Sequence, residues 1–142
     1  MQLRRTIEVP LPPEEAFPYV ADLSTTAAWD PSVKHAERLD EGPIGKGSEF
    51  RLLAVFGGRE LRLRYVITEH EAPRRVVFEG EGATLNATDT VTFTPTGLGT
   101  RIDWRADLRF RSLLRLLEPL LRLPLQKTAS RALAGLRDAL SA

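Results

Sequence analysis

Residues 100–110 read Thr-Arg-Ile-Asp-Trp-Arg-Ala-Asp-Leu-Arg-Phe, with charged and apolar side chains alternating from Arg101 onward. Successive side chains of a β-strand point to opposite faces. The segment is therefore predicted to be a strand with one dry face and one face in water. Its apolar face would carry Ile102, Trp104, Ala106, Leu108 and Phe110. A face of this length must be covered by other parts of the chain.

Upstream of this strand, apolar runs of similar character recur between turn residues. The pair Gly57-Gly58, for example, is typical of a two-residue hairpin turn. The segments that we expect to be strands are 2–9, 33–40, 48–56, 59–71, 74–80 and 83–94. Together with residues 100–110 they predict an antiparallel sheet of about seven strands with short connections.

Two short helices are predicted after the first strand. Pro12 and Pro13 suit the first turn of a helix over 13–21, because a proline at that position gives up no helical hydrogen bond. Pro18 would make this helix short or kinked, since it removes a backbone donor. Ser24 is a good N-cap for a second helix over 24–29.

The last part of the chain changes to a helical period. Apolar residues recur at spacings of four, three and four: Ala129, Leu133, Leu136 and Leu140. This spacing puts them on one face of a long helix over 126–140. Pro119 and Pro124 are expected to kink or divide the leucine-rich segment 112–125 that precedes it.

Length and composition narrow the class of protein. The chain has 142 residues, of which 42% are hydrophobic and 27% charged, with a net charge of +1 and no cysteine. We therefore expect a single domain over residues 1–142, without disulfides or thiolate metal sites. No segment resembles a membrane span or a secretory signal, so we expect a cytoplasmic protein. The weak charge and the lack of a basic, aromatic-rich patch argue against nucleic-acid binding.

Three stretches resemble a known family. They are Val9 through Asp22, Trp29 through Val33, and Phe93 through Trp104, followed by the long final helix. In this order they resemble the START-like, or SRPBCC, superfamily, which shares its fold with the birch pollen allergen. Within it, the chain is most similar to polyketide cyclase/dehydrase-like and lipid-transport proteins. Pro18 departs from the pattern, which has a good helix former there.

The resemblance implies an α+β fold of the helix-grip type. A curved antiparallel seven-stranded sheet would wrap around the long C-terminal helix, with two short helices after the first strand. The resemblance also implies that an apolar or amphipathic small molecule, such as a lipid, a quinone or a polyketide-like compound, binds in a central cavity. Some members of the superfamily catalyse cyclisation or dehydration, and others carry lipids or quinones.

A gap between a curled sheet and a helix is a natural apolar pocket, and we expect one of at least ~300 Å³ here. Its lining is predicted from the inward positions of the strands and of the leucine-rich C-terminal part. The expected ligand-binding residues are Phe50, Leu52, Leu63, Tyr65, Phe78, Asp89, Trp104, Leu108, Leu117, Leu121 and Leu133.

Three of the polar side chains are candidates for catalysis. Asp89 alternates with apolar residues, and a carboxyl group on a dry face is costly and often functional. The alternative is that Asp89 has no functional role, because it lies near the cavity mouth or because a bulge turns its side chain outward. By alternation His35 also points inward unless a bulge reverses it. In an enzyme, Asp89 or His35 would move a proton while Tyr65 polarises a carbonyl.

The remaining motifs predict neither a metal site nor a cofactor. His35 and His70 are the only histidines, and two imidazoles alone make a poor metal site. His70 lies between two glutamates at a strand end and is expected in solvent. The phosphate-loop spacing is not met around Lys46, and no dinucleotide fingerprint occurs.

Segment 111–125 holds more leucines than one buried face needs. Core packing against the strands is the simplest interpretation. Otherwise the surplus would form a gate over the cavity, a homodimer contact or a patch for peripheral membrane contact. Three functions therefore remain open: a small-molecule binding protein, a cyclase or dehydratase, and a membrane- or protein-interaction module.

Overall fold

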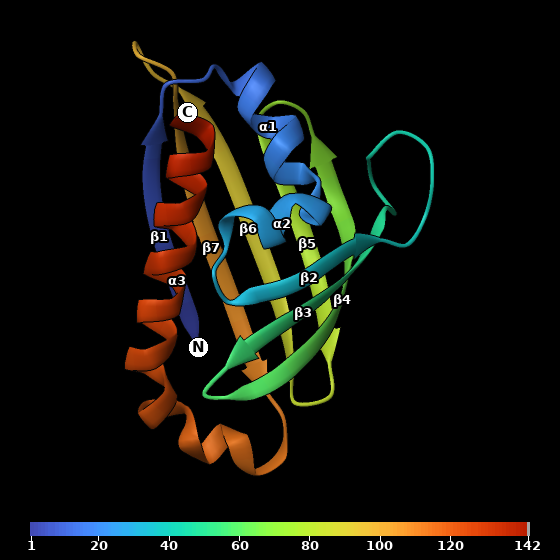
Figure 1. Ribbon diagram of the computed structural model, residues 1–142, viewed down its shortest axis with the longest axis vertical. Helices are drawn as coiled ribbons and strands as arrows, with labels where there is room; N and C mark the ends of the chain where they lie inside the picture. The colour runs from blue at the N-terminus through green and yellow to red at the C-terminus, as the bar shows by residue number, and fades with distance from the viewer. Residues whose placement is uncertain (142) are drawn as a thin grey trace.

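The computed structural model describes residues 1–141 and has the expected α+β architecture (Figure 1). One antiparallel sheet contains all of its strands in the order β1-β7-β6-β5-β4-β3-β2. The strands are β1 (Gln2–Val9), β2 (Val33–Arg38), β3 (Glu49–Phe56), β4 (Arg59–Glu71), β5 (Arg75–Gly82), β6 (Leu85–Pro95) and β7 (Thr100–Phe110). The predicted seven-stranded sheet is thus confirmed, with boundaries shifted by no more than a few residues.

The helices also follow the predicted order. Helix α1 (Pro13–Ala21) contains Pro18 and keeps the predicted bounds. The second short helix begins as a 3₁₀ turn, η1 (Leu23–Thr25), and continues as α2 (Thr26–Trp29). A further 3₁₀ segment, η2 (Ser112–Leu117), leads into the long helix α3 (Glu118–Ser141).

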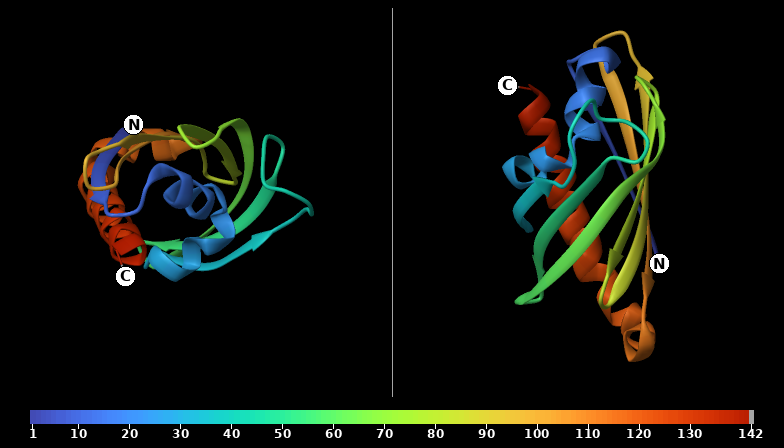
Figure 2. Two further views of the ribbon diagram at one scale, coloured as in Figure 1. Left: turned by 90° about the horizontal axis from the view of Figure 1, so that it is seen from above. Right: turned by 90° about the vertical axis from the view of Figure 1, so that its right-hand side faces the viewer.

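The sheet curls into an open ring, as the view from above in Figure 2 shows. Helix α3 lies along the edge strand β1, and α2 contacts both α3 and the other edge strand, β2. Helix α1 lies at one end of the ring against β6. The helices therefore cover the concave face of the sheet, which is the face that the sequence predicts to be apolar.

The segregation of side chains predicted for β7 is confirmed. Ile102 and Phe110 are buried, whereas Arg101, Arg105 and Arg109 are exposed on the convex face. Between the two buried residues, the inward-facing Trp104, Ala106 and Leu108 are only half-buried. Their partial exposure marks a place where the concave face is not packed against another side chain.

The leucine-rich segment 112–125 is divided, as expected, at Glu118, where the 3₁₀ segment η2 ends and α3 begins next to Pro119. The expected break at Pro124 does not occur. Helix α3 runs without interruption from Glu118 through Pro124 to Ser141. Pro119 lies in the first turn, where its missing N–H is not needed. Pro124 removes one interior hydrogen bond, at a typical cost of about 3 kcal/mol. Burial of Leu133, Leu136 and Leu140 further along the same helix offsets that cost.

Candidate functional site

A cavity of about 210 Å³ lies between the concave face of the sheet and helix α3. A second lobe of about 130 Å³ adjoins it, and the two share Trp29, Asp30, Asp89 and Trp104 in their walls. Neither lobe alone reaches the ~300 Å³ expected of a ligand pocket. Because they share these walls, we treat them as one space and call it the inner cavity.

Most of the lining residues predicted from strands lie at the inner cavity. Those that line its larger lobe are Leu52, Leu63, Tyr65, Asp89, Trp104 and Leu108. Leu133 of α3 lines the smaller lobe. Alternation along β3, β4, β6 and β7 therefore placed these side chains on the correct face.

Four of the predicted lining residues lie elsewhere. Phe50 and Phe78 have no exposed surface and belong to the packed core, Phe78 stacking on the far side of Trp104 at 6.4 Å between ring centroids. Leu121 packs against the edge of the core without lining the cavity. Leu117 is exposed, because η2 leaves the end of the sheet before α3 begins.

Asp89 is the carboxyl group that the sequence singled out, and it lies in the wall of both lobes. On the neighbouring strands it is paired with Phe78 and Ala106. The pKa of Asp89 is raised to about 7, mainly by burial; a hydrogen bond from the Trp104 indole opposes the rise, and the charges of Glu79 and Asp107 add to it. Asp89 therefore exchanges its proton near neutral pH inside a mainly apolar space.

A second carboxyl group, Asp30, lines both lobes and was not predicted from the sequence. It accepts hydrogen bonds from the backbone N–H of Ser32 at 2.9 Å and from the Ser32 hydroxyl at 2.8 Å. Burial raises its pKa, and these hydrogen bonds limit the rise. The available signal was local: in Asp30-Pro31-Ser32, an aspartate two residues before a serine is typical of an Asx turn.

Tyr65 supplies a hydroxyl group to the same space. Burial raises the pKa of Tyr65 well above its usual value, and the charges of Asp89 and Asp30 act in the same direction. The hydroxyl therefore stays protonated and is available to donate a hydrogen bond. With two carboxyl groups and this donor, the inner cavity can orient a polar group of a mostly apolar ligand and exchange a proton with it.

Two tryptophans stiffen the wall next to these polar groups. The rings of Trp29 and Trp104 meet edge to face at 5.9 Å between centroids. The indole N–H of Trp29 donates to the Thr25 hydroxyl at 3.2 Å, which fixes the orientation of that ring. Large flat side chains held in this way provide apolar contact area at little conformational cost.

Both histidines lie away from the inner cavity. The register of β2 against β3 shifts between Val33 and His35. This bulge turns His35 outward, where its side chain is exposed beside Glu37. Of the two residues expected to move a proton, Asp89 therefore lies at the inner cavity and His35 does not.

For His70, the expectation of a solvated side chain is wrong. A register shift between Ile67 and Glu69 on β4 precedes it. His70 is half-buried, and its ring packs edge to face against Phe17 of α1, with 5.2 Å between centroids.

Within residues 1–141 no group of acidic, histidine or cysteine side chains is arranged to hold a metal ion.

The expectation that the surplus leucines pack in the core is wrong for part of segment 111–125. Leu114, Leu121 and Leu125 pack against the core. Five others are exposed at the start of the helical region: Leu113, Leu116, Leu117, Leu120 and Leu123. We call these five residues the leucine patch.

No helix in the described part of the chain is long and apolar enough to cross a bilayer.

The fold and its interior define a class: an antiparallel sheet that wraps around a long C-terminal helix, with the inner cavity between them. The chain belongs to the polyketide cyclase / dehydrase and lipid transport family, whose model matches residues 1–141. This confirms the resemblance to START-like proteins stated on the sequence. Curated protein sequences gave no match.

Solved structures share the fold over nearly the whole chain. TTHA0849 from Thermus thermophilus is 23% identical, with a TM-score of 0.85 and coverage of 99% of this chain and 97% of the other. A START superfamily protein from Mycobacterium smegmatis is 18% identical, with a TM-score of 0.78 and 99% coverage of both chains. The di-domain ARO/CYC protein StfQ from the steffimycin biosynthetic pathway is 18% identical, with a TM-score of 0.76. That match covers 99% of this chain and 50% of StfQ.

Proposed function

We propose that the protein binds an apolar or amphipathic small molecule, of the lipid, quinone or polyketide-like kind, in the inner cavity. The observation that carries this proposal is the character of the walls. Apolar side chains such as Leu52, Leu63 and Trp104 make up most of them, with a few polar groups converging from β4, β6 and the turn after α2. This combination is typical of small-molecule sites. The family to which the chain belongs also includes lipid-transport proteins in its description.

The experiment is binding of a neutral apolar fluorophore, N-phenyl-1-naphthylamine, to the purified protein. We expect saturable binding and a rise in melting temperature, because a ligand that binds only the folded state stabilises it. Native mass spectrometry of the same sample would show any ligand that copurifies. Absence of both fluorophore binding and a thermal shift would contradict the proposal.

A second candidate function is a cyclase- or dehydratase-type reaction, and the presence of Asp89 and Tyr65 in one cavity favours it. In a dehydration, the Asp89 carboxylate would remove a proton from the carbon beside a substrate carbonyl. Tyr65 would hydrogen-bond the carbonyl oxygen. The hydroxyl group on the next carbon would then leave as water, taking the proton from Asp89.

This reaction is tested with a polyketide-like β-hydroxy ketone, following the loss of one water by mass spectrometry. Asp89→Asn should abolish turnover and leave fluorophore binding intact. Asp103→Asn, on the convex face beside Arg4, is the matched control and should keep full activity. Water loss at the wild-type rate in Asp89→Asn would remove this residue from the mechanism.

A third candidate, contact with a membrane surface, is favoured by the leucine patch. Its exposed side chains alternate with Arg115 and Arg122, and Glu118 is the only acidic residue in segment 111–125. Apolar side chains bordered by cations suit the headgroup region of an anionic bilayer. The protein should therefore float with vesicles of phosphatidylcholine and phosphatidylserine.

The matched variants for flotation are Leu116→Asp with Leu120→Asp, against Leu98→Asp. Leu98 is 90% exposed but lies in the β6–β7 turn. Only the change in the leucine patch should abolish flotation. If the protein instead dimerises in a concentration-dependent way, without lipid, and the same double variant abolishes dimerisation, the patch is a homodimer contact and the membrane proposal is wrong.

A further inference from the structure

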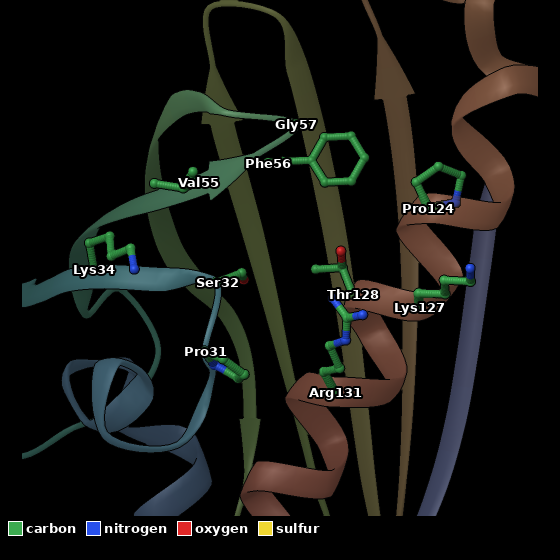
Figure 3. Close-up of a pocket in the computed structure, with 10 residues that line it drawn as sticks. All are labelled: Pro31, Ser32, Lys34, Val55, Phe56, Gly57, Pro124, Lys127, Thr128 and Arg131. Carbon is green, nitrogen blue, oxygen red and sulfur yellow. The ribbon is translucent and has the colours of Figure 1, made fainter.

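A second hollow opens on the outside of the protein, between α3 and the strands β2 and β3 (Figure 3). Its volume is about 410 Å³. The ring of Phe56 extends from the end of β3 toward α3, and the guanidinium group of Arg131 extends along α3 toward Thr128. We call this hollow the outer groove.

The outer groove and the inner cavity adjoin each other. Ser32, just before β2, and Thr128, on α3, belong to the walls of both. These two residues come from opposite sides, one from the sheet side and one from the helix. The boundary between the two spaces is therefore a gap between β2 and α3, where no strand-to-strand ladder closes the ring. A molecule that passed from the groove to the interior would have to cross this gap.

The outer groove carries uncompensated positive charge. Lys34, Lys127 and Arg131 line it, and none of its lining residues is acidic. In the described chain none of these three side chains takes part in an ion pair or a side-chain hydrogen bond, whereas nearby Arg51 on β3 is bound to Glu37 at 2.9 Å. Cations gathered in a concave surface without counter-charges attract anions.

The inner cavity has the opposite electrostatic character. Asp30 and Asp89 lie in the walls of both lobes. The larger lobe has no basic side chain in its lining, and the smaller lobe has Arg5, which donates hydrogen bonds to the Ser130 hydroxyl and the Gln126 carbonyl. Moving an anionic group from water into this space would cost desolvation and would place it beside carboxyl groups. An anionic group is therefore favoured in the outer groove and disfavoured in the inner cavity. An apolar group, by contrast, is favoured in the inner cavity.

We propose that the natural ligand is an amphipathic anion. Its carboxylate or phosphate group stays in the outer groove at Lys34, Lys127 and Arg131, and its apolar body passes between Ser32 and Thr128 into the inner cavity. This inference rests on the proposed binding function and adds the chemical class and orientation of the ligand. Two connected spaces of opposite polarity act as a selector for molecules with one charged end.

The test compares two fluorophores that differ by one anionic group: 8-anilino-1-naphthalenesulfonate and the neutral N-phenyl-1-naphthylamine. The double variant Lys34→Gln with Arg131→Gln removes one cation from each wall of the groove. It should weaken binding of the anionic probe by about tenfold, because each of the two partly exposed ion pairs adds only modestly to the affinity. Binding of the neutral probe should not change, and raising the salt concentration should weaken only the anionic probe.

The matched control is Lys46→Gln with Arg137→Gln, which removes two exposed cations outside the groove. It should leave both probes unaffected. Unchanged affinity for the anionic probe in Lys34→Gln with Arg131→Gln, or equal loss in the two double variants, would overturn the inference while leaving the proposed function standing. Failure of both probes to bind would contradict the proposed function itself.

Competition experiments separate the sources of the anionic group. Decanoate and decyl phosphate should each displace the sulfonate probe, and the more effective of the two identifies the preferred headgroup. Inorganic phosphate alone should not displace it at similar concentrations. Displacement by inorganic phosphate as strong as that by decyl phosphate would mean that the groove binds free anions and that the ligand has no apolar body.

Discussion

Gly135 of α3 lies directly against the backbone of Trp29, so closely that a β-carbon at position 135 would collide with the Trp29 carbonyl oxygen. The distance from that β-carbon to the carbonyl carbon of Trp29 would be 3.0 Å. This contact lets α2 approach α3 where Trp29 forms a wall of the inner cavity. A residue without a side chain therefore sets the spacing between the two helices that border the site.

We expect Gly135→Ala to destabilise the protein by about 1–3 kcal/mol, because the backbone of Trp29 must move to make room. Alanine otherwise stabilises a helix interior relative to glycine by about 1 kcal/mol, so a loss of stability is diagnostic. Chemical denaturation provides the measurement. Gly97→Ala is the control, since a β-carbon there meets no atom of the described chain within 4 Å. A stabilised Gly135→Ala variant would show that the contact is not tight.

Filling the inner cavity should abolish binding without unfolding the protein. Ala106 lines both lobes, and Ala106→Leu would occupy part of the space with a change in stability of less than about 3 kcal/mol. We expect at least a tenfold loss of affinity for N-phenyl-1-naphthylamine, measured by fluorescence titration. Ala139→Leu, at an exposed position of α3, should bind like the wild type. Retained affinity in Ala106→Leu would place the fluorophore elsewhere.

The pKa of Asp89 predicts how stability depends on pH. An aspartate in an unfolded chain has a pKa near 3.9, whereas burial raises that of Asp89 to about 7. Between these values the folded state holds the proton more tightly than the unfolded state does. This contribution to the free energy of unfolding is therefore present below pH ~4 and is lost as the pH rises to about 7.

Asp89→Asn should remove this dependence and be more stable than the wild type at pH 8, by on the order of 2–4 kcal/mol. At pH 4 the two proteins should differ little. Denaturant unfolding at both pH values provides the measurement, and Asp103→Asn, which loses an ion pair with Arg4, should not gain stability at pH 8. If the free energy of unfolding of Asp89→Asn and of the wild type changed with pH in the same way, the pKa of Asp89 would not be raised in the folded protein.

Replacing exposed leucines should cost almost no stability. Leu116 and Leu120 are 76% and 74% exposed, so Leu116→Ser with Leu120→Ser should change the free energy of unfolding by less than about 1 kcal/mol. Leu136 is fully buried on the same helix, and Leu136→Ala should cost about 2–5 kcal/mol. Thermal and urea unfolding compare the three proteins. A large loss in the double serine variant would mean that the leucine patch packs against the protein in solution.

Alternation in the sequence predicted the sheet and much of the cavity wall, because a regular strand fixes the direction of every side chain. On β7 the strict pattern placed Trp104 and Leu108 correctly, and on β6 it placed Asp89 at the cavity. The amphipathic period of residues 129–140 likewise identified the helix face that is buried. Each of these inferences depends only on local geometry.

The errors lie where long-range packing overrides a local rule. A bulge after Val33 turns His35 outward, and register shifts of this kind leave little trace in a single sequence. Pro124 is tolerated because tertiary contacts stabilise the rest of α3. Asp30 was missed because its inward position depends on the turn that joins α2 to β2.

The sheet ends at β1 on one side and at β2 on the other, and these two edges are bridged by helices and not by a ladder. Packed helices slide by small amounts against their neighbours, whereas paired strands change register only in steps that turn every side chain to the other face. The two sheet edges are therefore joined by contacts that could shift without breaking a strand pair. If a ligand binds in the inner cavity, such a shift would let the protein fit ligands of different thickness while every strand keeps its neighbours.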